Sequence, residues 1–248
     1  MARTRTPGKA EWGWGRSAVG FRSAYLDFDR GIRVGNLEDH ERITGILKGA
    51  LESRFRTPFV TERYGRGVFW QWIGYLAREN RAAKPISSGV SFGCSKFFIE
   101  VDTGERRFKC GLQVERGYVR PPKGSSWFRL RPDWDWHRLH AGLRPRAPLM
   151  RELSRLVRDG FEIHAGTWAD PHVFAGGRLP SAARLRALLD EAAAGQWCGF
   201  QAYYALDEAD VRAIPGPELV DVMVAVFDEV APALSLCSQV RLPPADSV

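Results

Sequence analysis

The stretch KFFIEVDTGERRFKCGLQVERGYV, residues 96–119, decides the fold. Apolar residues alternate with polar ones on both sides of a Thr-Gly pair at residues 103 and 104. This period-two alternation around a glycine turn predicts an antiparallel β-hairpin with one buried face and one polar face. The apolar positions are Phe97, Ile99, Val101, Phe108, Cys110, Leu112 and Val114.

The length of the turn sets which residues face each other across this hairpin. A two-residue turn at 103 and 104 places Glu100 opposite Arg107, and such a pair of opposite charges contributes a few tenths to about 1 kcal/mol. A three-residue turn with Gly104 in the left-handed conformation changes the register. The sequence leaves both possibilities open.

Helical and extended segments flank the hairpin. Residues 25–34 predict a short strand pair, and residues 61–80, which are bulky and apolar, predict a buried helix or a strand–helix pair. Helices are predicted at 148–158 and 180–194, each opened by a proline, and a buried or edge strand is predicted at 197–206.

The most strongly patterned helix lies near the C-terminus. Pro217 suits its first position, and apolar residues cover most of its circumference down to Val230, so this helix should lie in the core. Pro232 is predicted to end it. The whole pattern predicts an α+β fold, with an antiparallel sheet built around a central β-hairpin, covered by helices, and a buried C-terminal helix.

The composition is that of a globular protein. Of the 248 residues, 44% are hydrophobic and 26% are charged, which excludes wholesale disorder. No apolar run is long enough to span a membrane, no apolar signal segment follows the basic N-terminus, and the four cysteines form no CxxC pair. We therefore expect a cytoplasmic protein with a flexible basic arm over residues 1–20 and a single α+β domain over residues 21–240.

Basic and aromatic residues are interleaved between residues 116 and 146, in a chain whose formal net charge is +7. Basic side chains neutralise phosphates and aromatic faces stack on bases, so this region indicates binding of nucleic acid or another polyanion. The alternative is that the tryptophans are core residues and the arginines form a solvated surface. The predicted contact residues are Arg116, Arg120, Lys123, Trp127, Arg129, Arg131, Trp134, Trp136 and Arg138.

Four of the five histidines lie between residues 137 and 172. His137 and His140 are three residues apart, so on a helix they share one face and suit two ligands of a metal site. His164 and His172 flank a turn and are candidates for the remaining ligands. This pattern predicts a divalent metal and a metal-dependent enzyme of the hydrolase or nuclease type, whereas the alternative is a set of hydrogen-bonded structural histidines.

Motifs of established chemistry do not decide between these hypotheses. The sequence has no GxSxG, no GxxxxGK[ST], and no GxGxxG after a predicted strand. A structural or assembly subunit that uses exposed tryptophans as binding hot spots is a third hypothesis. Salt-dependent binding to polyanions distinguishes the nucleic-acid hypothesis from the assembly-subunit hypothesis, and metal content identifies the metal-dependent enzyme.

Overall fold

The computed structural model describes residues 18–83, 94–116, 134–167, 169–193, 196 and 198–242. These residues form nine strands, seven α-helices and one short 3-10 turn. The strands are β1 (Leu26–Asp27), β2 (Gly31–Arg33), β3 (Phe59–Arg66), β4 (Phe69–Ala77), β5 (Ser95–Asp102), β6 (Arg107–Arg116), β7 (Glu162–Thr167), β8 (Pro171–Phe174) and β9 (Cys198–Asp207). The helices are α1 (Ile43–Phe55), α2 (Arg78–Ala82), α3 (Asp135–Gly142), α4 (Pro148–Arg158), α5 (Ala182–Asp190), α6 (Glu208–Ala213) and α7 (Gly216–Cys237).

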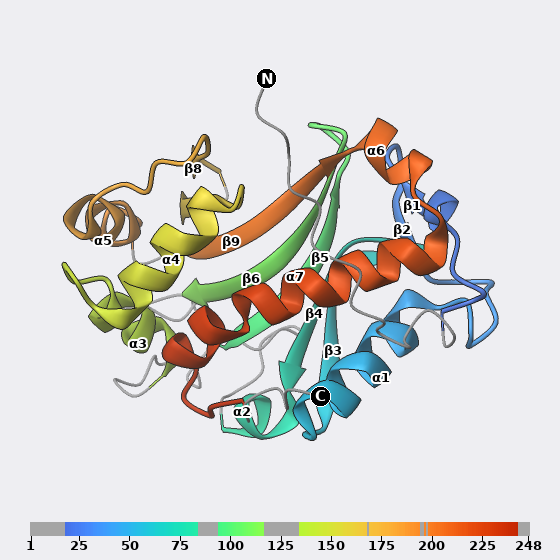
Figure 1. Ribbon diagram of the computed structural model, residues 1–248, viewed down its shortest axis with the longest axis horizontal. Helices are drawn as coiled ribbons and strands as arrows, with labels where there is room; N and C mark the ends of the chain where they lie inside the picture. Colours follow the sequence, from blue (N-terminus) through green and yellow to red (C-terminus); the bar gives the residue numbers. More distant parts are fainter. Residues whose placement is uncertain are drawn as a thin grey trace, which may run out of the picture.

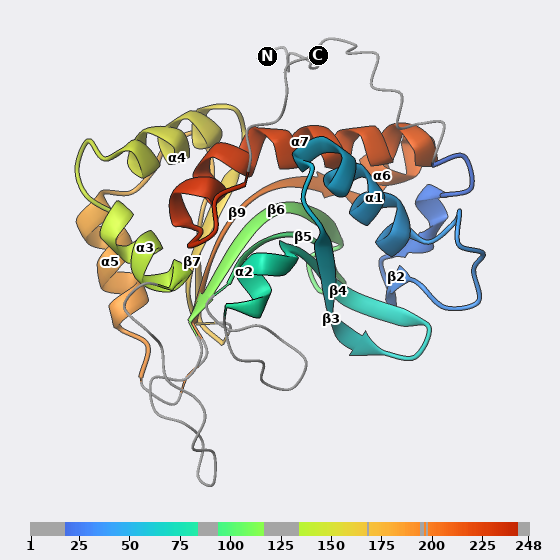
Figure 2. The same cartoon turned by 90° about the horizontal axis from the view of Figure 1, so that it is seen from below.

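All nine strands belong to one antiparallel sheet. Its order is β1-β2-β4-β5-β6-β9-β7-β8, and β3 pairs with β4 off this path. Helix α7 crosses the sheet between α1 and α4 (Figure 1), and these three helices lie on one side of the curved sheet (Figure 2). The predicted α+β fold, with helices over a sheet built on a central hairpin, is confirmed.

The central hairpin is β5–β6, but its register differs from the two-residue-turn prediction. Glu100 lies opposite Lys109, so the turn has four residues, 103–106. Asp102 Oδ1 accepts the backbone N–H groups of Gly104 and Glu105 at 3.0 and 2.9 Å, which stabilises the longer turn. Because the shift is by two residues, the predicted division between the two faces is unchanged.

The C-terminal helix α7 is buried as predicted, but it does not end at Pro232. It continues to Cys237, because Ala233, Leu234 and Cys237 beyond the proline are buried in the core. On the sheet side, Phe227 packs against Phe97 with ring centroids 4.9 Å apart. In the described residues, no helix combines the length and apolar character needed to cross a membrane.

The segment predicted as a buried helix or a strand–helix pair is the β3–β4 hairpin followed by the short helix α2. The two strands pair from Phe59 opposite Ala77 to Arg66 opposite Phe69. Residues 72–77 of β4 are all buried, on both faces of the sheet. The strand therefore lacks the apolar–polar alternation of a half-exposed strand.

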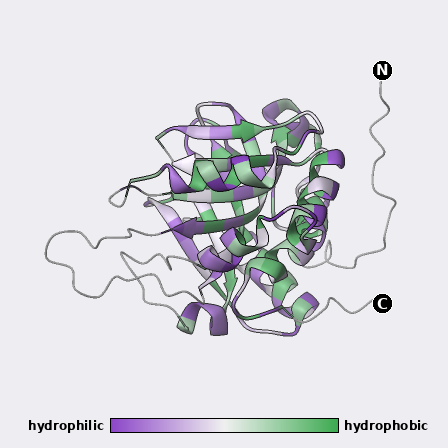
Figure 3. Cartoon of the chain, turned by 90° about the vertical axis from the view of Figure 1, so that its left-hand side faces the viewer, coloured by the Kyte–Doolittle hydropathy of each residue, from purple (hydrophilic) through white to green (hydrophobic). Residues whose placement is uncertain are grey.

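The face of the sheet away from the helices, which we call the polar face, is buried as well. Its strands carry hydrophilic residues beside hydrophobic ones (Figure 3). A small aromatic cluster of Trp72, Phe98 and Tyr203 is separate from the main core. The polar residues of this face are Glu62, Lys96, Glu100, Lys109, Gln113, Glu115, His164 and Gln201.

Candidate nucleic-acid interface

The predicted basic and aromatic region lies only partly in the described structure. Residues 117–133 fall outside it, and with them five of the nine predicted contact residues. Those five are Arg120, Lys123, Trp127, Arg129 and Arg131.

Three of the remaining four predicted contact residues are part of the interior. Trp134 is 1% exposed and Trp136 is 5% exposed. Arg116 is buried, and its guanidinium donates to the backbone carbonyls of Ala192, Ala193 and Gln196 at 2.8–3.1 Å. These three side chains stabilise the fold and offer no face to a ligand in solution, in agreement with the alternative that the tryptophans are core residues. Arg138 is exposed on α3.

His137 and His140 both lie on helix α3, in different surroundings. His137 is exposed, whereas His140 points to α5, where its Nε2 lies 3.1 Å from Asp190 Oδ1. This contact is an exposed pairing between two helices, of a kind that contributes at most about 1 kcal/mol.

The other two histidines lie on opposite faces of the β7–β8 pair. His164 is opposite Val173 on the polar face, and His172 is opposite Ala165, which faces the main core. Within the described ranges, no three His, Cys, Asp or Glu side chains are placed to hold one metal ion. His164 and His172 therefore lie on different faces of the sheet, and metal binding by the histidines stays a prediction.

A different set of arginines and aromatic rings meets where β2, β3 and β4 end together. Phe69 lies opposite Arg33 on β2 and opposite Arg66 on β3, so arginines flank one ring on both neighbouring strands. We call this region the arginine–aromatic surface. It consists of Arg30, Arg33, Arg63, Arg66, Tyr64, Phe69 and Trp70.

Two arginines of this surface stack on its aromatic rings. The guanidinium carbon of Arg30 lies 3.9 Å from the centroid of the Phe69 ring, and that of Arg63 lies 4.3 Å from the centroid of the Trp70 ring. Stacking of this kind contributes about 0.5–1 kcal/mol at an exposed site and leaves the outer face of the guanidinium and its N–H edge open.

The charge of this surface is not neutralised within the described part of the chain. No carboxylate there lies within 4.0 Å of the guanidinium nitrogens of Arg30, Arg33, Arg63 or Arg66, whereas Arg106, Arg107 and Arg155 are each held by carboxylates. The nearby Asp29 is paired with Arg106, and Asp27 accepts backbone N–H groups of its own turn. Four arginines without a carboxylate partner among the described residues therefore lie at neighbouring positions of the β1–β2 turn, β2 and β3. The Arg33 guanidinium also donates to the backbone carbonyl of Asn36 at 3.4 Å and lies 5.7 Å from the centroid of the Tyr25 ring.

Glycines shape the backbone that presents these side chains. Gly65 has a φ of +139°, and a Cβ there would lie 2.5 Å from the Trp70 Cα, so only glycine fits beside Trp70. The register shifts at this point, which is a β-bulge. Gly67, with a φ of +64°, turns the chain back into β4. The adjacent Tyr64 is left 70% exposed.

The polar face contains a second group of titratable side chains. Burial raises the pKa of Glu100 to about 7, against the attraction of Lys109. Burial and the positive charge of Lys109 lower the pKa of His164 to about 4. Burial is the main cause of both shifts. Shifted pKa values of this kind arise in structural ion-pair networks as well as in active sites.

These two groups are expected to oppose each other in the pH dependence of stability. Folded Glu100 keeps a proton that the unfolded chain loses above its ordinary pKa of 4.5, so its contribution to stability falls as the pH rises to about 7. Folded His164 stays neutral while the unfolded chain binds a proton below pH 6.5, so its contribution rises between about pH 4 and 6.5.

The variants Glu100→Gln and His164→Gln should therefore change the pH profile in opposite directions. Relative to the wild type, stability should rise with pH in the first and fall with pH in the second, each by at most about 1.4 kcal/mol per pH unit. Urea unfolding between pH 4.5 and 6.5 measures these slopes. Parallel profiles for the wild type and both variants would contradict the assigned ionisations.

Comparison with known proteins gives no independent indication of function. No protein-family model matches the sequence, and no curated protein matches it significantly.

Proposed function

We propose that this protein binds nucleic acid or another phosphate-rich ligand through the arginine–aromatic surface. The observation that carries the proposal is the group of four arginines without a carboxylate partner in the described residues, two of them stacked on aromatic rings. Guanidinium groups bind phosphate oxygens through paired N–H donors, and a stacked guanidinium is already held in one orientation.

This surface combines the same residue types as the segment 116–146, for which the sequence predicts nucleic-acid binding, but it lies elsewhere in the chain. Arg30 and Arg33 come from the β1–β2 turn and β2, and Arg63 and Arg66 come from the edge strand β3. Aromatic residues and arginine are also enriched at protein interfaces. Four like charges without described counterions favour a polyanion over a protein of mixed charge.

Fluorescence anisotropy with labelled oligonucleotides, at several salt concentrations, tests the proposal. For the wild type we expect the logarithm of the association constant to fall linearly with the logarithm of the salt concentration. The double variant Arg63→Ala/Arg66→Ala should bind about tenfold more weakly at low salt, and its slope should be smaller by about 1.4 for a single strand, at about 0.7 per phosphate contact.

The matched control is Arg144→Ala/Arg158→Ala. This variant removes the same charge from exposed positions next to and on α4, without touching the arginine–aromatic surface. It should bind as the wild type does, apart from a small uniform loss from the lower net charge. Equal losses in the two double variants, or the absence of binding to any polyanion at low salt, would overturn the proposal.

A further inference from the structure

The arginine–aromatic surface extends over both sides of the sheet. Phe69 and Trp70 are consecutive residues of β4, so their rings point to opposite faces. Trp70 packs partly against the main core on the helix side, with Arg63 stacked on it. Phe69 lies on the other side, between Arg33 and Arg66 and with Arg30 over its ring.

The two sides meet at a free edge. Strand β3 pairs with β4 along one side, and in the described part of the chain no strand pairs with its other side. Its side chains alternate around this edge, with Arg63 towards the helix side and Tyr64 and Arg66 towards the side of Phe69. Figure 2 shows the β3–β4 hairpin extending at one end of the sheet.

A ligand that contacts both stacked pairs must therefore bend around the edge of β3. The two side-chain layers of a sheet are separated only by the thickness of its backbone. Duplex DNA, with a persistence length of about 50 nm, resists bending over such a distance, whereas a single strand bends freely. The bases of a single strand are also unpaired, so they can stack on the outer faces of Arg30 and Arg63 and on the ring of Tyr64.

We infer that the ligand is a single-stranded nucleic acid, which passes around the free edge of β3 and stacks unpaired bases on Arg30, Arg63 and Tyr64. This inference rests on the proposed function and narrows it to one class of polyanion. Phosphate contacts come from the N–H edges of the four arginines, and the stacked planes select for exposed bases.

The test compares three probes of matched total charge on the full-length protein: a single-stranded oligonucleotide, a duplex of half its length, and linear inorganic polyphosphate. The single strand should bind at least about tenfold more tightly than either of the others. The variant Arg30→Lys/Arg63→Lys keeps both charges but loses both planar groups. It should lose the preference for the single strand while its affinity for polyphosphate stays within about twofold.

The control variant Arg144→Lys/Arg158→Lys makes the same exchange at exposed positions elsewhere and should keep the preference. If the wild type binds the duplex or polyphosphate as tightly as the single strand, the inference is overturned and the proposed function stands. If the lysine variant retains the full preference, stacking on the arginines is excluded. If none of the three probes binds at low salt, the proposed function fails with the inference.

Discussion

Replacement of Lys96 by methionine is expected to lower the free energy of unfolding by about 3–5 kcal/mol, a large share of the 5–15 kcal/mol typical of a domain. Lys96 is 0% exposed, and its Nζ lies 2.9 Å from Glu62 Oε2 and 3.3 Å from Glu115 Oε2. Burial opposes the charge, but Glu115 and Glu62 hold the pKa of Lys96 above its ordinary value. The side chain is therefore an ammonium group.

Methionine removes this ammonium and leaves two buried carboxylates without it. Burial already raises the pKa of Glu115 above its ordinary value, and Lys96 opposes that rise. Without Lys96 the pKa of this carboxyl rises further, so the variant should lose less stability at low pH than at neutral pH. Denaturant unfolding of both proteins at pH 5 and pH 7 measures the difference.

The triple variant Lys96→Met/Glu62→Gln/Glu115→Gln is the control for this interpretation. It removes the three charges together, so it should recover most of the stability lost in the single variant. A single variant within about 0.5 kcal/mol of the wild type, or a triple variant less stable than the single one, would show that the ion pairs do not stabilise the polar face as described.

Replacement of Asp135 by alanine should cost about 3–5 kcal/mol, because this buried carboxylate binds several donors from distant segments. Its Oδ2 accepts from the Ser95 backbone N–H at 2.5 Å, from Ser95 Oγ at 2.7 Å and from Asn80 Nδ2 at 2.8 Å. Its Oδ1 accepts from the backbone N–H of Gln239 at 2.6 Å. Asp135 thus joins α2, β5 and α3 to the segment after α7.

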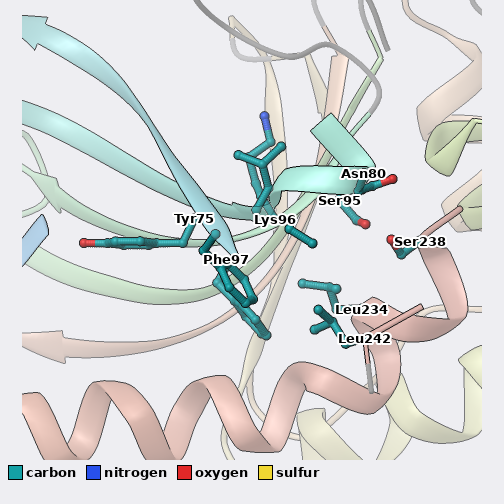
Figure 4. A pocket seen from close by; sticks show the side chains of 11 residues that line it. Tyr75, Asn80, Ser95, Lys96, Phe97, Leu234, Ser238 and Leu242 are labelled. Carbon is teal, nitrogen blue, oxygen red and sulfur yellow. The ribbon is translucent and has the colours of Figure 1, made fainter. Parts of the chain in front are cut away.

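The setting of this cluster explains why the loss should be large. Asn80, Ser95 and Ser238 lie together where β5 begins (Figure 4). In the same view, Lys96 extends to the opposite side of the strand from Phe97. Alanine leaves three buried donors and one partly buried donor without this acceptor, and each buried group costs about 1–3 kcal/mol when no other partner replaces it.

The matched control for Asp135 is Asp190→Ala. Asp190 is a carboxylate of the same size, but its side chain is 66% exposed and pairs with His140 at the surface. Its loss should cost at most about 1 kcal/mol. Thermal or denaturant unfolding of the two variants gives the comparison, and similar losses in both would contradict the central position of Asp135.

The sequence predicted the faces of the central hairpin but not its register. Alternation fixes which side chains share a face, whereas the register depends on the turn. Here the Asp102 carboxylate binds the N–H groups of the turn and favours four residues. The β3–β4 hairpin was missed because Trp72, Ile73 and Tyr75 are all buried, so β4 shows no alternation.

The arginine–aromatic surface lies outside the segment that the sequence singled out, and nucleic-acid binding by either region stays a prediction. Arginines near aromatic residues were sought in one continuous segment, 116–146. The arginine–aromatic surface instead combines Arg30 of the β1–β2 turn with Phe69 of β4, which are 39 residues apart and meet only through strand pairing. Composition also does not distinguish a tryptophan stacked at the surface from one in the core, such as Trp134.

Photo-cross-linking would test most directly whether the arginine–aromatic surface binds nucleic acid. A single-stranded oligonucleotide containing 4-thiouridine is irradiated in complex with the full-length protein, and the linked peptides are mapped by mass spectrometry. Binding at this surface predicts links within β3 and β4, at Tyr64, Phe69 or Trp70, which disappear at high salt. Links confined to residues 117–158, with none in β3 or β4, would contradict it.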